Sequence, residues 1–180
     1  MDIRGLAKRV QAWHVTVAFF AYVLGSVLWF QLGPLAELGE TGILDDDWGF
    51  TPTEGRAHLD ALGAEGVATY ETFLAFDFAY ALLFVPPILG VFLIALRRHR
   101  IWPVWPVAVP FVAAALDWSE NGLLLAAIND PSSDAVWRAA SMASLGKLLL
   151  VSASFAVAVL LLVAWGAHLV MNPMKKVKRA

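Results

Sequence analysis

Residues 137–170 read WRAASMASLGKLLLVSASFAVAVLLLVAWGAHLV. After Arg138, this run contains Lys147 as its single Asp, Glu, Lys or Arg. A helix needs about 20 apolar residues to cross the hydrocarbon core of a bilayer. The run is longer than that, so it predicts a transmembrane helix that tilts or projects past the interface. It also isolates one charged side chain within that helix.

The composition of the whole chain agrees with a membrane class. Of its 180 residues, 59% are hydrophobic and only 16% are charged, whereas a soluble domain carries about 25% charged residues. The eight Trp residues are typical of chains with membrane interfaces. The absence of cysteine excludes disulfides, thiolate metal sites and thiol catalysis.

The hydrophobic pattern predicts four membrane spans in one domain covering residues 1–180. The links at 97–101 and 129–136 are short, which forces neighbouring spans to run antiparallel. We therefore expect an all-α membrane protein, an antiparallel up-down-up-down four-helix transmembrane bundle. The predicted spans are 13–32, 70–96, 102–128 and 137–170.

A long loop, residues 33–69, separates the first two predicted spans and should contain a short helix. Thr51-Pro-Thr-Glu54 has the pattern of a capping box with proline in the first turn. We expect this helix to end at Gly63. Pro86-Pro87 and Pro110 should kink the second and third spans, and two kinked neighbours would open a cavity towards the outside.

The charges predict an orientation. Ten of the thirteen Lys and Arg residues fall before the first span, in the 97–101 link, or after the fourth span. By the positive-inside rule both termini should be cytoplasmic, with the acidic loops outside. The basic residues are divided among short segments on one membrane face, so nucleic acid is not an expected partner.

Four Asp, Glu or Lys residues lie deep within the predicted spans, at about 10–16 Å from their outer ends. They are Asp77, Asp117, Glu120 and Lys147. Charge in hydrocarbon is costly, so such side chains usually face one another, a cavity or a ligand. Helical spacing adds companions on the same faces. The predicted buried polar cluster or ligand-binding site consists of Asp77, Tyr80, Asp117, Glu120, Asn121, Ser144 and Lys147.

Several of these residues carry a resemblance. The order of four sequence features resembles an uncharacterised family of small bacterial four-helix integral membrane proteins with an LDxxEN motif in the third helix. These features are Leu59–Gly66, Asp77, Leu116–Asn121 (LDWSEN) and Leu145-Gly-Lys147. The resemblance implies the same topology and a bacterial cytoplasmic (inner) membrane location. It implies no reaction.

Two functional hypotheses follow. The first is a small polytopic membrane protein that is non-catalytic, a subunit of a larger membrane assembly, whose buried acid/lysine cluster holds the bundle together. The alternative is an intramembrane enzyme or binder acting on a lipid or isoprenoid near the outer leaflet, with Asp117 and Glu120 as candidate catalytic acid and base. An accessible cavity lined by the cluster would favour the alternative.

The sequence does not decide whether the chain is an enzyme, and it identifies no cofactor. No set of nitrogen or sulfur ligands lies at one depth, so no zinc site is predicted. A hard cation held by Asp77, Asp117 and Glu120 remains an alternative. The expected partner is membrane lipid, with a protein partner or a homo-oligomer as further alternatives.

Overall fold

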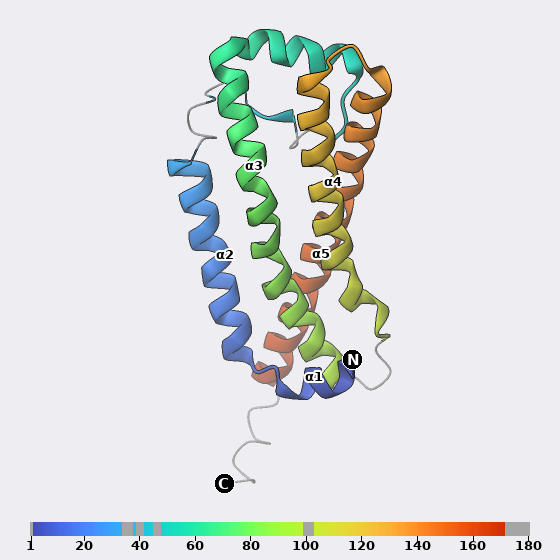
Figure 1. Ribbon diagram of the computed structural model, residues 1–180. Coiled ribbons are helices and arrows are strands. Elements are labelled where there is room, and N and C mark those ends of the chain that lie inside the picture. Colours follow the sequence, from blue (N-terminus) through green and yellow to red (C-terminus); the bar gives the residue numbers. More distant parts are fainter. Residues whose placement is uncertain (1, 34–37, 39–41, 45–47, 99–102, 172–180) are drawn as a thin grey trace.

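The computed structural model describes residues 2–33, 38, 42–44, 48–98 and 103–171 (Figure 1). Within these residues all regular secondary structure is helical. The elements in order are α1 (Ile3–Arg9), α2 (Ala12–Leu32), α3 (Pro52–Arg98), the 3-10 helix η4 (Trp105–Ala108), α4 (Val109–Asn129) and α5 (Asp134–Met171).

Three helices in the described part of the chain are long and apolar enough to cross a membrane. They are α3, the continuous η4–α4 segment and α5. The first predicted span, α2, meets the same test only when it is joined with α1 across an 88° bend. The structure thus gives three candidate spans, or up to four if the bent pair counts as one.

Helix α3 is the centre of the packing. It contacts α1, α2, α4 and α5, and α4 and α5 pack closely on each other. Glycines allow the approach of α2 to α3, because a β-carbon at Gly90 would lie 2.7 Å from a methyl carbon of Val15. Figure 1 shows the four long helices side by side.

The helix predicted in the outer loop is present as the first part of α3. The backbone N–H of Thr51 donates to Glu54 at 2.7 Å, and the Thr51 hydroxyl accepts from the Glu54 N–H at 3.3 Å, which confirms the capping box. Gly63 interrupts the helix with a φ of 65°, a conformation that favours glycine. The segment before Gly63 lies across the end of the other helices (Figure 1).

A hydrophobic cluster ties this crossing segment to the C-terminal end of α4 and the N-terminal end of α5. Trp137 is fully buried in it, and a β-carbon at Gly55 would lie 2.5 Å from the Trp137 ring. Arg56 pairs with Asp134 at 2.8 Å. Trp137 is therefore a core residue in the first turn of α5.

Pro110 behaves differently from the prediction. Pro110 lies in the first turn of α4, where proline is tolerated, so the predicted kink at Pro110 is wrong. Helix α3 has its one non-helical residue at Gly63 and stays helical through Pro86 and Pro87. The predicted start of the third span, Trp102, lies outside the described residues.

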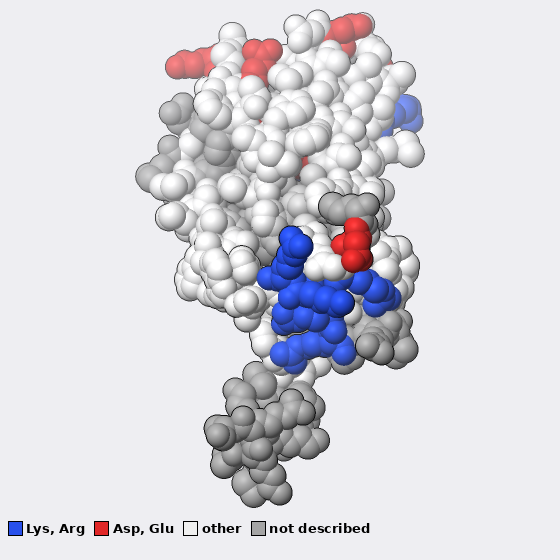
Figure 2. All heavy atoms as spheres, turned by 60° about the horizontal axis from the view of Figure 1, so that its bottom comes forward, with Lys and Arg blue, Asp and Glu red and all other residues white. Residues whose placement is uncertain are grey.

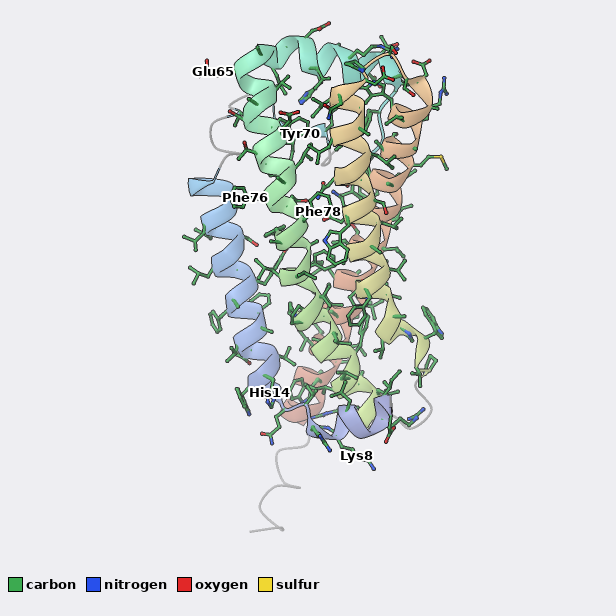
Figure 3. All side chains as sticks on the ribbon, in the orientation of Figure 1. Lys8, His14, Glu65, Tyr70, Phe76 and Phe78 are labelled. Carbon is green, nitrogen blue, oxygen red and sulfur yellow. The ribbon has the colours of Figure 1, made fainter. Side chains whose placement is uncertain are left out.

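Charge divides between the two ends of the molecule. Figure 2 shows most of the Lys and Arg gathered at the end that contains α1 and the end of α3, with an acidic side chain beside them, whereas the other visible Asp and Glu lie at the far end, together with a smaller basic patch. Figure 3 likewise places Lys8 and His14 at the end opposite Glu65. We call the first end the basic end. Its described cations are Arg4, Lys8, Arg9, Arg97 and Arg98.

Candidate functional site

Helix α4 presents three polar residues on one inward face. Asp117, Glu120 and Asn121 are spaced at i, i+3 and i+4, so one face of the helix carries all of them. All three are buried. The neighbouring positions point elsewhere: Ser119 is exposed and bonds back to the Ala115 carbonyl at 2.7 Å, and the exposed Trp118 donates to the Phe78 carbonyl of α3 at 2.7 Å.

Lys147 of α5 meets two of these acids. Its Nζ lies 2.5 Å from Glu120 Oε2 and 3.3 Å from Asp117 Oδ1. Glu120 has no exposed surface, and Lys147 is only 8% exposed. A charged pair this deeply buried needs close geometry to offset the loss of hydration. The predicted convergence of the third and fourth spans is therefore present, with two acid contacts on the lysine.

Asp77 of α3 completes the polar layer. The Asn121 amide donates to Asp77 Oδ2 at 3.0 Å, which links α3 to α4. Ser144, one turn before Lys147 on α5, is fully buried with its hydroxyl beside Glu120. The structure thus brings the predicted residues of α3, α4 and α5 into one connected group.

Tyr80 extends this group to α2, which the sequence analysis did not include. Its hydroxyl lies 2.9 Å from the Ser26 hydroxyl, and Ser26 donates to the Tyr22 carbonyl at 2.8 Å. The Tyr22 and Tyr80 rings are 6.3 Å apart. Tyr22 and Ser26 are one helical turn apart within an apolar span, a spacing that could have identified them.

A cavity of about 190 Å³ opens beside the polar layer. Asp77, Asp117 and Lys147 line it, and Tyr22 and Tyr80 contribute their rings. The remaining lining residues are apolar: Ile43, Phe73, Phe84, Leu148 and Val151. Glu120 does not reach the cavity. The cluster therefore has a closed part, the Lys147–Glu120 contact, and an open part at Asp77 and Asp117.

The open part carries an unused hydrogen-bond acceptor. Asp117 is 6% exposed, and its Oδ2 has no hydrogen-bond partner within the described ranges. Asn121 Oδ1 and Glu120 Oε1 also lack a partner there, but neither residue lines the cavity. Buried polar atoms in proteins nearly always have a partner, so Asp117 Oδ2 marks a place where a donor from outside the chain would fit.

The layer contains more acid than base, with three carboxyl groups and one lysine. It has no arrangement of three or more Asp, Glu, His or Cys side chains that could hold a metal ion, as judged over the residues that the structure describes. The hard-cation alternative therefore has no preformed site in this part of the chain. The groups present can bind a small polar group by hydrogen bonds and charge.

Comparisons with other proteins add no identity. No protein-family model, curated protein or solved structure matches this chain. The function is therefore argued from the geometry of the site.

Proposed function

We propose that this chain is a membrane protein of the bacterial cytoplasmic membrane, built as an antiparallel four-helix bundle with both termini in the cytoplasm. The alternating direction of the four long helices in Figure 1 supports this architecture. The concentration of cations at the basic end supports the orientation, because Lys and Arg are enriched on the cytoplasmic side. The polar layer then lies within the outer half of the bilayer.

The function that the geometry supports best is binding of an amphipathic molecule of the lipid or isoprenoid class. The observation that carries it is the cavity, because three ionisable side chains from three helices line a space bounded otherwise by apolar and aromatic groups. A purely structural ion-pair network has no need of such a space. Ionisable groups that face a cavity within a membrane usually serve a ligand or pathway.

The size of the cavity limits what enters it. A volume of about 190 Å³ corresponds to roughly six water molecules at ~30 Å³ each. It therefore accepts a polar head of a few atoms and leaves the apolar remainder of the ligand in the bilayer. The unused Oδ2 of Asp117, which lines the cavity, favours a head that donates hydrogen bonds, such as an amine or a hydroxyl.

Binding fits the site better than catalysis by the predicted acid–base pair. Glu120 is fully buried behind the lysine and does not line the cavity. A general acid or base must come within hydrogen-bond reach of the proton that it transfers. Asp117 meets that condition for a ligand in the cavity, whereas Glu120 does not.

A structural role is the second candidate, and the Lys147–Glu120 contact favours it. This contact joins α4 to α5 at 2.5 Å with no solvent exposure of the glutamate. Under this reading the charges fix the register of the helices, and the cavity holds only water.

Mass spectrometry of lipids retained through purification in a mild detergent tests the proposal. The parent protein should retain one class of amine- or hydroxyl-bearing amphipath. Asp117→Asn should reduce its retention about tenfold, since a hydrogen bond to a charged group contributes about 1.5–3 kcal/mol. Ser119→Ala is the matched control on the opposite face of α4 and should retain the parent amount.

Two results would contradict binding at this site. One is a parent protein that retains no amphipath above the detergent background. The other is an Asp117→Asn variant that retains as much as Ser119→Ala. Helical content and monodispersity of each variant, measured first, separate loss of ligand from loss of fold.

A further inference from the structure

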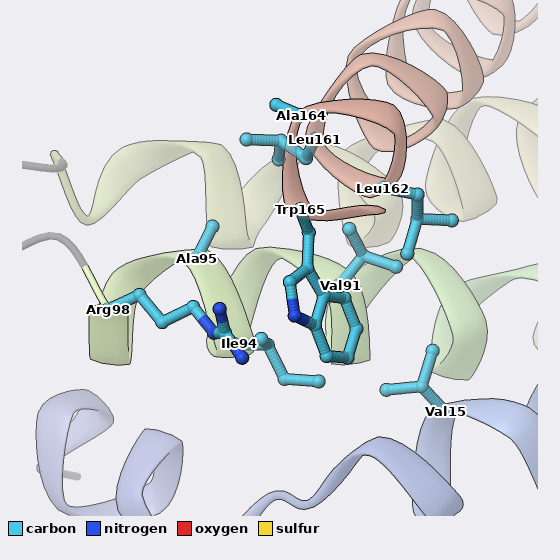
Figure 4. Close-up of a pocket in the computed structure, with 9 residues that line it drawn as sticks. All are labelled: Val15, Val91, Ile94, Ala95, Arg98, Leu161, Leu162, Ala164 and Trp165. Atoms are coloured by element: carbon cyan, nitrogen blue, oxygen red, sulfur yellow. The ribbon is translucent and has the colours of Figure 1, made fainter. Parts of the chain in front are cut away.

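A second cavity lies at the basic end of the molecule, away from the polar layer. It has a volume of about 410 Å³ and lies between α2, α3 and α5. Its walls are mostly apolar, with Val15 from α2, Val91 from α3 and Leu161 from α5, and its polar members are Arg98 and Trp165 (Figure 4). Nothing in the polar-layer function uses this space.

The helix packing explains the groove. Helices α2 and α5 both pack on α3, whereas α2 and α5 have little contact with each other among the described residues. The Tyr22 and Phe155 rings, 5.9 Å apart, bring α2 and α5 together further along. Tyr22 is seven residues beyond Val15, or about 10 Å along the helix. The groove is therefore an apolar slot of limited depth that begins at the basic end.

At the mouth of the groove lie a cation and a hydrogen-bond donor, neither of which has an ion-pair or hydrogen-bond partner among the described residues. The Arg98 guanidinium carbon lies 4.5 Å from the centroid of the Trp165 ring. No described acidic side chain forms an ion pair with Arg98. The Trp165 Nε1 is buried without an acceptor within the described ranges, and Figure 4 shows this nitrogen on the side of the ring that faces Arg98.

We propose that this groove binds an anionic phospholipid. The phosphate accepts hydrogen bonds from Arg98 and from the Trp165 indole, and an acyl chain occupies the slot between α2 and α5. Guanidinium groups suit phosphate because their N–H groups match its oxygens in pairs. Basic pockets between transmembrane helices at a basic membrane face are suited to anionic headgroups.

Charge complementarity selects an anionic lipid over a zwitterionic one. Arg4, Lys8, Arg9 and Arg97 surround the same end of the molecule. A cation that contacts the headgroup raises the affinity for a negative lipid about fivefold, whereas an exposed cation farther from the phosphate contributes less because salt screens it. The groove supplies what a diffuse basic surface lacks, namely a bounded place for a chain and two neighbouring donors, Arg98 and the Trp165 indole.

Native mass spectrometry of the full chain in detergent, with added lipid, tests this site. The probes are phosphatidylglycerol, phosphatidylcholine with the same acyl chains, and glycerol phosphate without chains. We expect phosphatidylglycerol to bind at least fivefold more tightly than phosphatidylcholine. Glycerol phosphate should form no complex, because the apolar slot then contributes nothing. A glycerol phosphate complex as stable as that of the lipid would identify a free-anion site and overturn the proposal.

Variants distinguish the groove from general surface charge. Arg98→Gln should weaken phosphatidylglycerol binding at least fivefold. Trp165→Phe keeps an aromatic ring beside Arg98 but removes the N–H donor, and should weaken binding about threefold. Lys8→Gln removes one charge from the same end without lining the groove, and should change binding less than twofold. Equal losses in Arg98→Gln and Lys8→Gln, or unchanged binding in Trp165→Phe, would refute the site.

The result is separable from that of the polar layer. Asp117→Asn should leave phosphatidylglycerol binding unchanged, because Asp117 lines the other cavity. A loss of phosphatidylglycerol in that variant would show that both lipids share one site and would overturn the separate groove.

Discussion

Replacing Lys147 with methionine removes the cation of the polar layer at nearly constant volume. Glu120, which has no exposed surface, loses a contact of 2.5 Å, and Asp117 loses one of 3.3 Å. Each contact between charged groups contributes about 1.5–3 kcal/mol. Breaking a buried pair by removing one partner usually costs about 3–5 kcal/mol, because the remaining charge is left without compensation. We therefore expect Lys147→Met to lower the free energy of unfolding by about 3–5 kcal/mol.

Unfolding in mixed micelles with increasing fractions of sodium dodecyl sulfate, followed by circular dichroism, measures this difference. Lys8→Met is the control, since it removes an exposed lysine and should change stability by no more than about 0.5 kcal/mol. The double variant Lys147→Met/Glu120→Gln should recover part of the loss, because the most deeply buried uncompensated charge is gone. A Lys147→Met protein as stable as the Lys8→Met control would refute the reasoning.

Three further outcomes are expected. Gly55→Ala should lower stability by about 1–3 kcal/mol through overpacking, because its new β-carbon meets the buried Trp137 ring; thermal unfolding measures this. The pKa of Glu54 is lowered from 4.5, first by the backbone N–H of Thr51 and then by its hydroxyl. This cap therefore stabilises the helix at neutral pH, and the stabilisation is lost as pH falls below 4.5 through the folded pKa. Hydrogen exchange over residues 52–62 should increase as the pH falls through this range, and the increase should be smaller in Glu54→Gln. Arg97→Gln loses a 2.7 Å bond to the C-cap carbonyl of α1, so α1 should exchange faster while the polar layer is unchanged.

The sequence was sufficient to predict which faces and depths carry the polar layer. The spacing of Asp117, Glu120 and Asn121 places them on one face whatever the tertiary structure, because the helix period fixes it. Depth follows from the rise per residue, which is why Asp77 and Lys147 were expected near them. The capping box at Thr51 and the helix break at Gly63 could also be predicted from the sequence, since both depend on local backbone chemistry.

The rest depended on how the helices rotate and pack. Helical spacing does not show which neighbour a side chain meets, so the Ser26 partner of Tyr80 was not foreseen. Trp137 satisfies both the pattern of an interface residue and that of a core residue, and only the crossing segment at Gly55 decides between them. At Pro110, the 3-10 turn of η4 places proline in a first turn. Hydropathy alone does not reveal that a 3-10 turn precedes the α-helix at this point.

The ion-pair network and the cavity beside it both require the Lys147 side chain to point into the helix bundle. Solid-state NMR on bilayer-embedded protein, labelled with ¹⁵N at lysine and ¹³C at carboxyl groups, measures this directly, with the signal assigned by its loss in Lys147→Met. We predict a strong dipolar coupling between Lys147 Nζ and the Glu120 carboxyl carbon, as the 2.5 Å contact requires, and a weaker one to Asp117. A Lys147 signal coupled to no carboxyl carbon would contradict the account.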